Sequence, residues 1–139
     1  MDALQAIQET GVAVNGCFIL GCDGETRSSI DRLARFATDA SLADVQITLQ
    51  TPFPGTALRR RLQREKRLLA NRDWSHYTLF DVTFQPDAMP IEELEHAFRD
   101  LLRQVFDPEA VRCRQMLRRK IWQRHPKLGP SEFEPSCVT

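Results

Sequence analysis

The fold is decided by residues 12–26, which read VAVNGCFILGCDGET, an almost unbroken apolar run that ends in a glycine-bearing turn. Only Asn15 and Gly16 interrupt the run, which is typical of a strand covered on both faces in a parallel sheet. Gly21 and Gly24 allow a tight turn directly after this strand. Apolar residues then recur at helical spacing, which predicts a helix that contains Ile30, Leu33, Ala34, Phe36 and Ala37.

A second strand and helix follow the first pair. Residues 44–50 alternate apolar and polar side chains, and the segment TPFPGT at residues 51–56 stops this strand with two prolines and a glycine. Thr56 can cap a helix over residues 57–69, and Ser28 with Asp31 resembles a capping box for the earlier helix. This order predicts a βαβ unit with parallel strands. Because two strands do not complete a sheet, we expect an exposed edge that another segment covers.

Helical segments flank this unit. Residues 2–9 suit the end of a helix with Gly11 as its C-cap. Residues 71–86 are rich in aromatic side chains without a helical period, which predicts a loop with a short strand near residues 81–84. Pro90 begins an amphipathic helix, and Pro108 begins a basic helix that ends near His125. We therefore divide the chain into βα units at residues 1–70, a mostly α-helical extension at residues 71–126, and a disordered tail at residues 127–139.

Composition excludes several classes of function. Nineteen basic and nineteen acidic residues balance, so the net charge indicates neither a nucleic acid nor an acidic partner. No apolar run approaches the about 20 residues of a membrane span, and the N-terminus does not have the pattern of a secretory signal. The cysteines are irregularly spaced, which favours reduced thiols in a cytoplasmic protein. Cys17, in the apolar strand, is expected to be a buried, inert thiol.

Together the two strand ends resemble the fifth and sixth βα units of radical S-adenosylmethionine (SAM) barrels. GCFILG at residues 16–21 and GCDGET at residues 21–26 match the family's glycine–isoleucine–glycine pattern and the turn after it. TPFPGT at residues 51–56 matches the segment after the sixth strand of the cobalamin-dependent subgroup. Residues 67–90 are similar to the C-terminal extension of cobalamin-binding radical enzymes, a group that includes hopanoid and other lipid-modifying proteins. The resemblance spans about residues 11–106.

The resemblance implies an α/β fold, in which the last βα units of a partial (β/α) barrel precede a helical extension. It assigns a set of residues at or near the strand ends to the SAM pocket, where they contact the cofactor largely through backbone groups: Gly16, Ile19, Gly21, Glu25, Gln50, Thr51 and Pro52. Glu25 would support the turn. Cys22 and Asp23 depart from the family pattern, and we expect them to make the turn more polar and more flexible.

The family's chemistry needs a 4Fe-4S iron–sulfur cluster, held by a Cys-x-x-x-Cys-x-x-Cys loop, and in this subgroup also cobalamin. Cys17, Cys22, Cys113 and Cys137 reproduce neither that loop nor a common zinc spacing. We therefore assign no catalytic and no metal-binding residue, and we expect a C-terminal fragment without the cluster-binding and cobalamin domains. The implied chemistry of the intact enzyme is reductive cleavage of SAM to a 5′-deoxyadenosyl radical, followed by hydrogen abstraction from a small-molecule or lipid-like substrate. The chain alone should bind SAM weakly or not at all and should be inactive.

Two alternatives come from other classes of function. The chain could be a non-catalytic partner subunit that completes a barrel whose N-terminal half is a separate polypeptide. It could also be a small module that binds nucleic acid or membranes through its last helix, where Arg118 and Arg119 lie, although a solvated helix face explains these charges better. For Trp74, Tyr77 and Phe80, core packing is favoured over a substrate-cavity wall.

Overall fold

The computed structural model describes residues 2–40 and 42–124 and belongs to the mixed α/β class. The tail expected at residues 127–139 lies outside the described residues. The elements follow one another as α1 (Asp2–Glu9), β1 (Asn15–Leu20), α2 (Arg27–Asp39), β2 (Asp44–Leu49), α3 (Ala57–Arg64), the 3-10 helix η1 (Trp74–His76), α4 (Ile91–Val105) and α5 (Pro108–Arg124). Gly11 follows α1 with a φ of 90°, the conformation that the predicted glycine C-cap requires.

β1 and β2 form a parallel pair joined by α2, as the sequence predicts. Asn15 lies opposite Asp44 at one end of the register, and Leu20 lies opposite Leu49 at the other. The backbone of Gln50 continues the ladder, because its N–H donates to the carbonyl oxygen of Leu20 at 2.7 Å. In the described ranges the sheet has only these two strands, so the predicted barrel stays a prediction.

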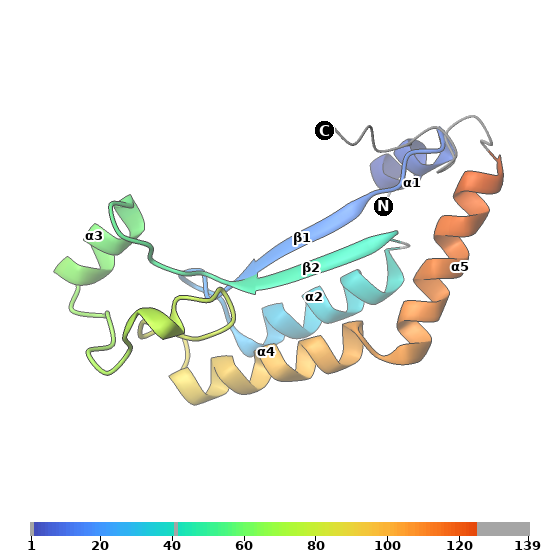
Figure 1. The fold of residues 1–139 in the computed structure, drawn as a ribbon. Helices are drawn as coiled ribbons and strands as arrows, with labels where there is room; N and C mark the ends of the chain where they lie inside the picture. Colours follow the sequence, from blue (N-terminus) through green and yellow to red (C-terminus); the bar gives the residue numbers. More distant parts are fainter. Residues whose placement is uncertain (1, 41, 125–139) are drawn as a thin grey trace, which may run out of the picture.

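Helix α2 lies along one face of the sheet, and α4 packs against α2 on the same side (Figure 1). The covered face and the two helices share one core, whose buried members include Leu20, Val45, Ile47, Leu49, Ile30, Ala34, Leu94, Phe98 and Leu101. This core joins the predicted βα units to the predicted extension, since α4 belongs to the latter. The stability of both parts therefore rests on the same buried side chains.

The opposite face of β1 is open in the part of the chain that the structure describes. Asn15, Cys17 and Ile19 are exposed there, and 59% of Ile19 is accessible. The prediction that this strand is covered on both faces is therefore wrong for the described residues, because both covering helices lie on one side. The expectation of a buried Cys17 is wrong for the same reason.

The two edges of the sheet differ. Beside β2, the N–H of Leu49 donates to the carbonyl oxygen of Leu79 at 2.7 Å, so the aromatic-rich loop borders this edge. β1 pairs with β2 alone among the described residues. An unpaired strand edge presents a row of backbone donors and acceptors to any further strand, as expected from the sequence.

Three local predictions are corrected by the structure. The N-cap of α2 is Thr26, which forms a capping box with Ser29, so the cap lies two residues earlier than the predicted Ser28. Helix α3 ends at Arg64 rather than near residue 69, and Lys66 turns the chain with a φ of 56°.

The third correction concerns the strand predicted near residues 81–84. Residue 84 forms only an isolated antiparallel bridge with Leu68. The early end of α3 explains it, since residues 67–69 leave the helix and run back beside residues 83–85.

Helix α5 meets α4 through an arginine. Arg114 is buried, and its guanidinium donates to the carbonyl oxygen of Val105 at the end of α4. Cations stabilise helix C-termini because the last carbonyl groups lack partners. At least this basic residue of α5 is therefore used for packing rather than for an external anion.

The packing of the covered face leaves no room for a side chain at Gly16. A Cβ added there would lie 2.6 Å from Leu42 Cδ1 and 2.9 Å from Phe18 Cε2. We expect Gly16→Ala to lower the free energy of unfolding by about 1–3 kcal/mol, the usual cost of overpacking, in urea denaturation. Leu42→Ala should cost less in the Gly16→Ala background than in the parent, because it removes the clashing methyl group. Strictly additive costs would contradict this explanation.

Candidate functional site

The carboxyl ends of β1 and β2 lie side by side, because Leu20 and Leu49 are partners in the register. In parallel α/β sheets ligands bind in the crevice outside these ends. The segments that follow the two strands meet there: a Cβ added to Gly21 would lie 3.9 Å from Gln50 Cβ. Helix α3 and the loop that contains η1 extend beyond the same end (Figure 1).

Most of the residues predicted for the site gather at or next to this end of the sheet: Ile19, Gly21, Glu25, Gln50, Thr51 and Pro52. Gly16 does not. It lies opposite Val45 in the first half of β1, and the space that its side chain would fill is taken by Leu42 and Phe18. The structure thus gives Gly16 a packing role away from the strand ends.

The turn at residues 21–26 is held by two carboxylates. Gly21, with a φ of 88°, donates its N–H to Glu25 Oε2, and Gly24, with a φ of 76°, donates to both carboxylate oxygens of Asp87 at 3.0 and 3.1 Å. Positive φ values favour glycine at both positions. Because these N–H groups already donate hydrogen bonds within the chain, a ligand would have to be bound by other groups of the site.

Asp23 anchors the turn to the segments after β2. Its carboxylate accepts from Arg61 at 2.6 Å and from Arg67 at 2.9 Å. The hydrogen bond from Arg67, more than any other interaction, lowers the pKa of Asp23 below its ordinary value. The expectation that Asp23 makes the turn more flexible is therefore wrong, since two cations hold it.

Glu25 is half-buried and braces the turn from within. Burial raises the pKa of this carboxyl, and the hydrogen bond from the Gly21 N–H opposes the rise. Burial also raises the pKa of the Cys22 thiol, and the charges of Glu25 and Asp23 add to the effect. A raised thiol pKa disfavours the thiolate that acts as nucleophile or metal ligand.

The segment after β2 contains an unsatisfied polar group. Gln50 Oε1 is buried and has no hydrogen-bond partner among the described residues. Its neighbours are satisfied: Thr51 Oγ1 donates to the carbonyl oxygen of Leu49 at 3.1 Å, and the carbonyl oxygen of Pro52 accepts from Arg59 at 3.2 Å. Buried amide oxygens normally have a partner, which makes Gln50 Oε1 a candidate acceptor for a ligand at the strand ends.

These residues fit a nucleoside-type cofactor better than a metal cluster. Ile19 offers an exposed apolar surface on the open face, and Gln50 offers a carboxamide, which together suit a base with an apolar face and polar edges. The three cysteines in the described ranges do not converge as the ligands of an iron–sulfur cluster do, because Cys113 lies on α5 at the other end of the sheet. Among the described residues no three His, Cys, Asp or Glu side chains converge as metal ligands do.

Aromatic side chains beside β2 are more exposed than predicted. Trp74 is 64% accessible and Phe80 is 58% accessible, so core packing is the wrong interpretation for both. The rings of Trp74 and Tyr77 lie 4.9 Å apart. The sequence shows that aromatic residues gather in this segment, but their exposure depends on where the loop lies on the sheet edge.

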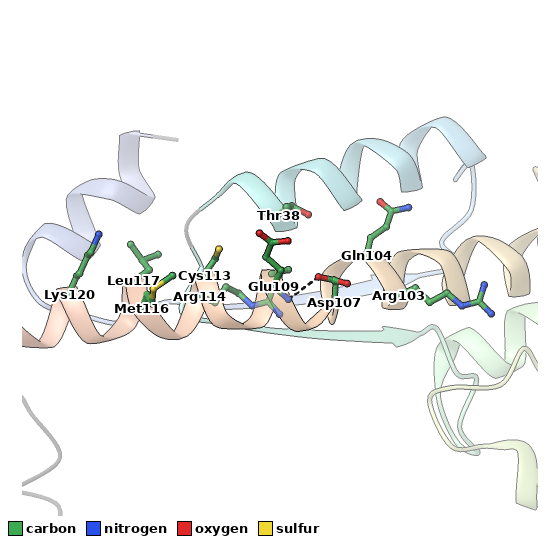
Figure 2. A pocket seen from close by; sticks show the side chains of 11 residues that line it. Thr38, Arg103, Gln104, Asp107, Glu109, Cys113, Arg114, Met116, Leu117 and Lys120 are labelled. Carbon is green, nitrogen blue, oxygen red and sulfur yellow. Dashed lines mark hydrogen bonds between the residues drawn. The ribbon is translucent and has the colours of Figure 1, made fainter.

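A groove of about 950 Å³ lies elsewhere, between the C-terminal ends of α2 and α4 and the length of α5. Figure 2 shows the side chains that line it, among them Thr38, Gln104, Cys113, Met116 and Lys120. It contains none of the residues predicted for the cofactor site. In Figure 1 its helices meet at the end of the sheet where the strands begin, opposite the strand ends described above.

Comparison with known families identifies the second half of the chain. Residues 56–133 match a family described as a domain of unknown function, DUF4070. The chain belongs to this family. The DUF4070 domain is found in cobalamin-binding radical SAM methyltransferase-like proteins, so the resemblance inferred from the sequence is confirmed at this level. The matched range begins at Thr56 and includes α3, η1, α4 and α5.

Curated relatives of this DUF4070 protein are named methyltransferases. An uncharacterized methyltransferase of Synechocystis sp. is 29% identical over 107 residues, which cover 77% of this chain and 20% of the relative. An uncharacterized methyltransferase of Pyrococcus horikoshii is 30% identical over 96 residues, or 69% and 19% of the two chains. The bacteriochlorophyllide d C-12(1)-methyltransferase of Chlorobaculum tepidum is 28% identical over 100 residues, or 72% and 21%. The chain therefore spans about a fifth of the length of these relatives.

Within residues 2–40 and 42–124, no helix is long and apolar enough to cross a membrane.

The ion pairs of Asp23 predict a pH-dependent stability. Asp23→Asn should lower the free energy of unfolding near pH 7, because it removes a carboxylate whose pKa is depressed in the folded state. This contribution is present above the unfolded-state pKa of about 3.9 and disappears as the pH falls through the folded-state value. The difference in the free energy of unfolding between Asp23→Asn and the parent protein should therefore shrink below about pH 4 in urea titrations. Asp39→Asn, an exposed change of the same charge, is the control and should show no such loss; an equal loss in both variants would refute the role of Asp23.

Proposed function

We propose that this chain is the part of a cobalamin-dependent radical SAM methyltransferase that helps to seat SAM at the carboxyl ends of β1 and β2 and walls off the substrate with residues 71–106. Membership of the DUF4070 family and the names of the relatives support the reaction class. The relatives are about five times as long, which supports a role within a larger enzyme. The chain alone, which has no residue assigned to catalysis, should be inactive.

The unsatisfied Gln50 Oε1 is the observation that carries this proposal. It lies at the strand end beside Gly21, where a parallel sheet binds its ligand, and it can accept a hydrogen bond from an amino group of SAM. Ile19 supplies an apolar surface for the adenine, and Glu25 keeps the turn in place through Gly21. SAM, when bound, would supply the methyl and radical chemistry of the intact enzyme, with the family's iron–sulfur cluster as the source of the electron.

The loop between α3 and α4 is suited to form the wall of the substrate cavity. Its Leu79 accepts a backbone hydrogen bond from Leu49, the last residue of β2, so the loop is fixed next to the strand end. Trp74 and Phe80 expose their rings from this loop. Exposed aromatic side chains beside a cofactor site are typical of pockets for apolar or conjugated substrates.

The unpaired edge of β1 also favours a second reading, in which a separate polypeptide supplies the neighbouring strands and this chain is its non-catalytic subunit. Both readings need the same strand-end geometry and differ only in the origin of the missing strands. The buried, hydrogen-bonded Arg114 weakens the third reading, a basic module for nucleic acid or membranes.

Binding of SAM to the 139-residue chain tests the proposal through NMR chemical shifts. We expect weak binding, because only part of the pocket is present, with shift changes at the amides of residues 19–25 and 50–52. Gln50→Ala should weaken this binding at least about tenfold, which corresponds to loss of one hydrogen bond to a charged group. Gln46→Ala, within β2 and before its carboxyl end, should have no effect. Shift changes that map to the groove along α5, or that ignore Gln50→Ala, would contradict the proposal.

A further inference from the structure

Four side chains form a compact cluster just beyond the strand ends, which we name the Arg59 cluster: Phe53, Arg59, Trp74 and Tyr77. The guanidinium carbon of Arg59 lies 5.2 Å from the ring centre of Trp74 and 5.4 Å from that of Tyr77. The rings of Phe53 and Tyr77 lie 6.4 Å apart. Arg59 therefore lies against two aromatic rings and does not extend freely into solvent.

The hydrogen bonds of Arg59 occupy one side of its guanidinium. Nη1 donates to the carbonyl oxygen of Pro52 at 3.2 Å and to Tyr77 Oη at 2.9 Å. Within residues 2–40 and 42–124, Nε and Nη2 have no hydrogen-bond partner and no carboxylate pairs with the group. Nε and Nη2 point their N–H bonds in parallel, which is the fork that binds both oxygens of a carboxylate. The contacts of Nη1 thus fix the orientation of an unused fork.

The surroundings of this fork are apolar. Among the described residues no carboxylate pairs with Arg59, so its positive charge is uncompensated. Trp74 is 64% accessible and Phe53 is 40% accessible, so two aromatic surfaces are open beside the charge. A ligand that complements this surface has a flat apolar body and an anionic group at its edge.

We propose that the Arg59 cluster anchors the substrate, which is a planar conjugated molecule that carries a carboxylate. The carboxylate binds the Nε–Nη2 fork of Arg59, and the conjugated body stacks on Trp74 and Phe53. The contact between Arg59 and Pro52 places this subsite next to the strand-end pocket, so the inference rests on the proposed function: SAM and the substrate's reacting edge would meet between them. Tyr77 is a positioning residue, because it orients the guanidinium through its hydroxyl group.

Calorimetric titration of the full chain with pyrene-1-carboxylate, pyrene-1-methanol and cyclohexanecarboxylate tests the inference. The first probe has both features of the proposed ligand, and each of the others lacks one. We expect pyrene-1-carboxylate to bind at least tenfold more tightly than either. Arg59→Lys keeps the charge but removes the fork, and it should weaken pyrene-1-carboxylate at least tenfold while leaving pyrene-1-methanol unchanged. Arg60→Lys, its neighbour on α3, is the matched control and should change neither affinity by more than about twofold.

Trp74→Leu provides a second variant, which we expect to fold because most of the Trp74 side chain is exposed to solvent. It should weaken both pyrene probes and leave cyclohexanecarboxylate unchanged. Equal effects of Arg59→Lys and Arg60→Lys, or equal affinity for the acid and the alcohol, would overturn the inference. Displacement of pyrene-1-carboxylate by an equal concentration of a ten-residue oligothymidylate would also overturn it, in favour of a nucleic-acid surface. SAM binding is read separately at residues 19–25 and 50–52, so failure of the subsite is distinguishable from failure of the cofactor proposal.

Discussion

The backbone ladder between β1 and β2 is the constraint on which the rest of the structure depends. Because Leu20 pairs with Leu49, the two glycine-bearing segments that follow the strands emerge at the same edge of the sheet. A parallel pair requires a crossover connection, which here is α2, and α2 must bury its apolar side. It does so between the sheet and α4, so the site, the crossover and the extension share one core.

The extension also determines the shape of the site. Phe84 and Leu94 come within contact distance of the position that a side chain at Gly21 would occupy, and Asp87 accepts the N–H of Gly24. A glycine turn alone is flexible, because glycine loses more conformational freedom on folding than other residues do. The contacts from residues 84–94 offset that cost. The conformation of the turn after β1 is thus stabilised by residues more than 60 positions later in the chain.

The sequence predicted the features that follow from local periodicity. The two strands, the crossover helix and the amphipathic α4 were expected because apolar residues recur at strand or helix spacing, and the strand-end glycines were expected because turns there need them. Features that depend on distant partners were not predictable. Nothing near Asp23 indicates that Arg61 and Arg67 would hold it, and the exposure of Cys17 follows from the placement of both covering helices on one face. The packing of Arg59 against aromatic rings was not predictable either, because its aromatic neighbours come from a loop 15 to 18 residues away.

The claim that the extension holds the strand-end turn is tested most directly by amide hydrogen exchange of the parent chain and of Asp87→Ala. The account predicts faster exchange at both Gly24 and Gly21 in the variant, with unchanged protection in β1, because Asp87 is the carboxylate that bonds the turn to the extension. Asp81→Ala removes a carboxylate of the same loop that accepts a hydrogen bond from Thr78 and from no other residue in the described ranges, and it should leave both glycine amides unchanged. Exchange at Gly24 and Gly21 that is identical in the parent and in Asp87→Ala would show that the turn holds its shape without the extension, and would contradict the account.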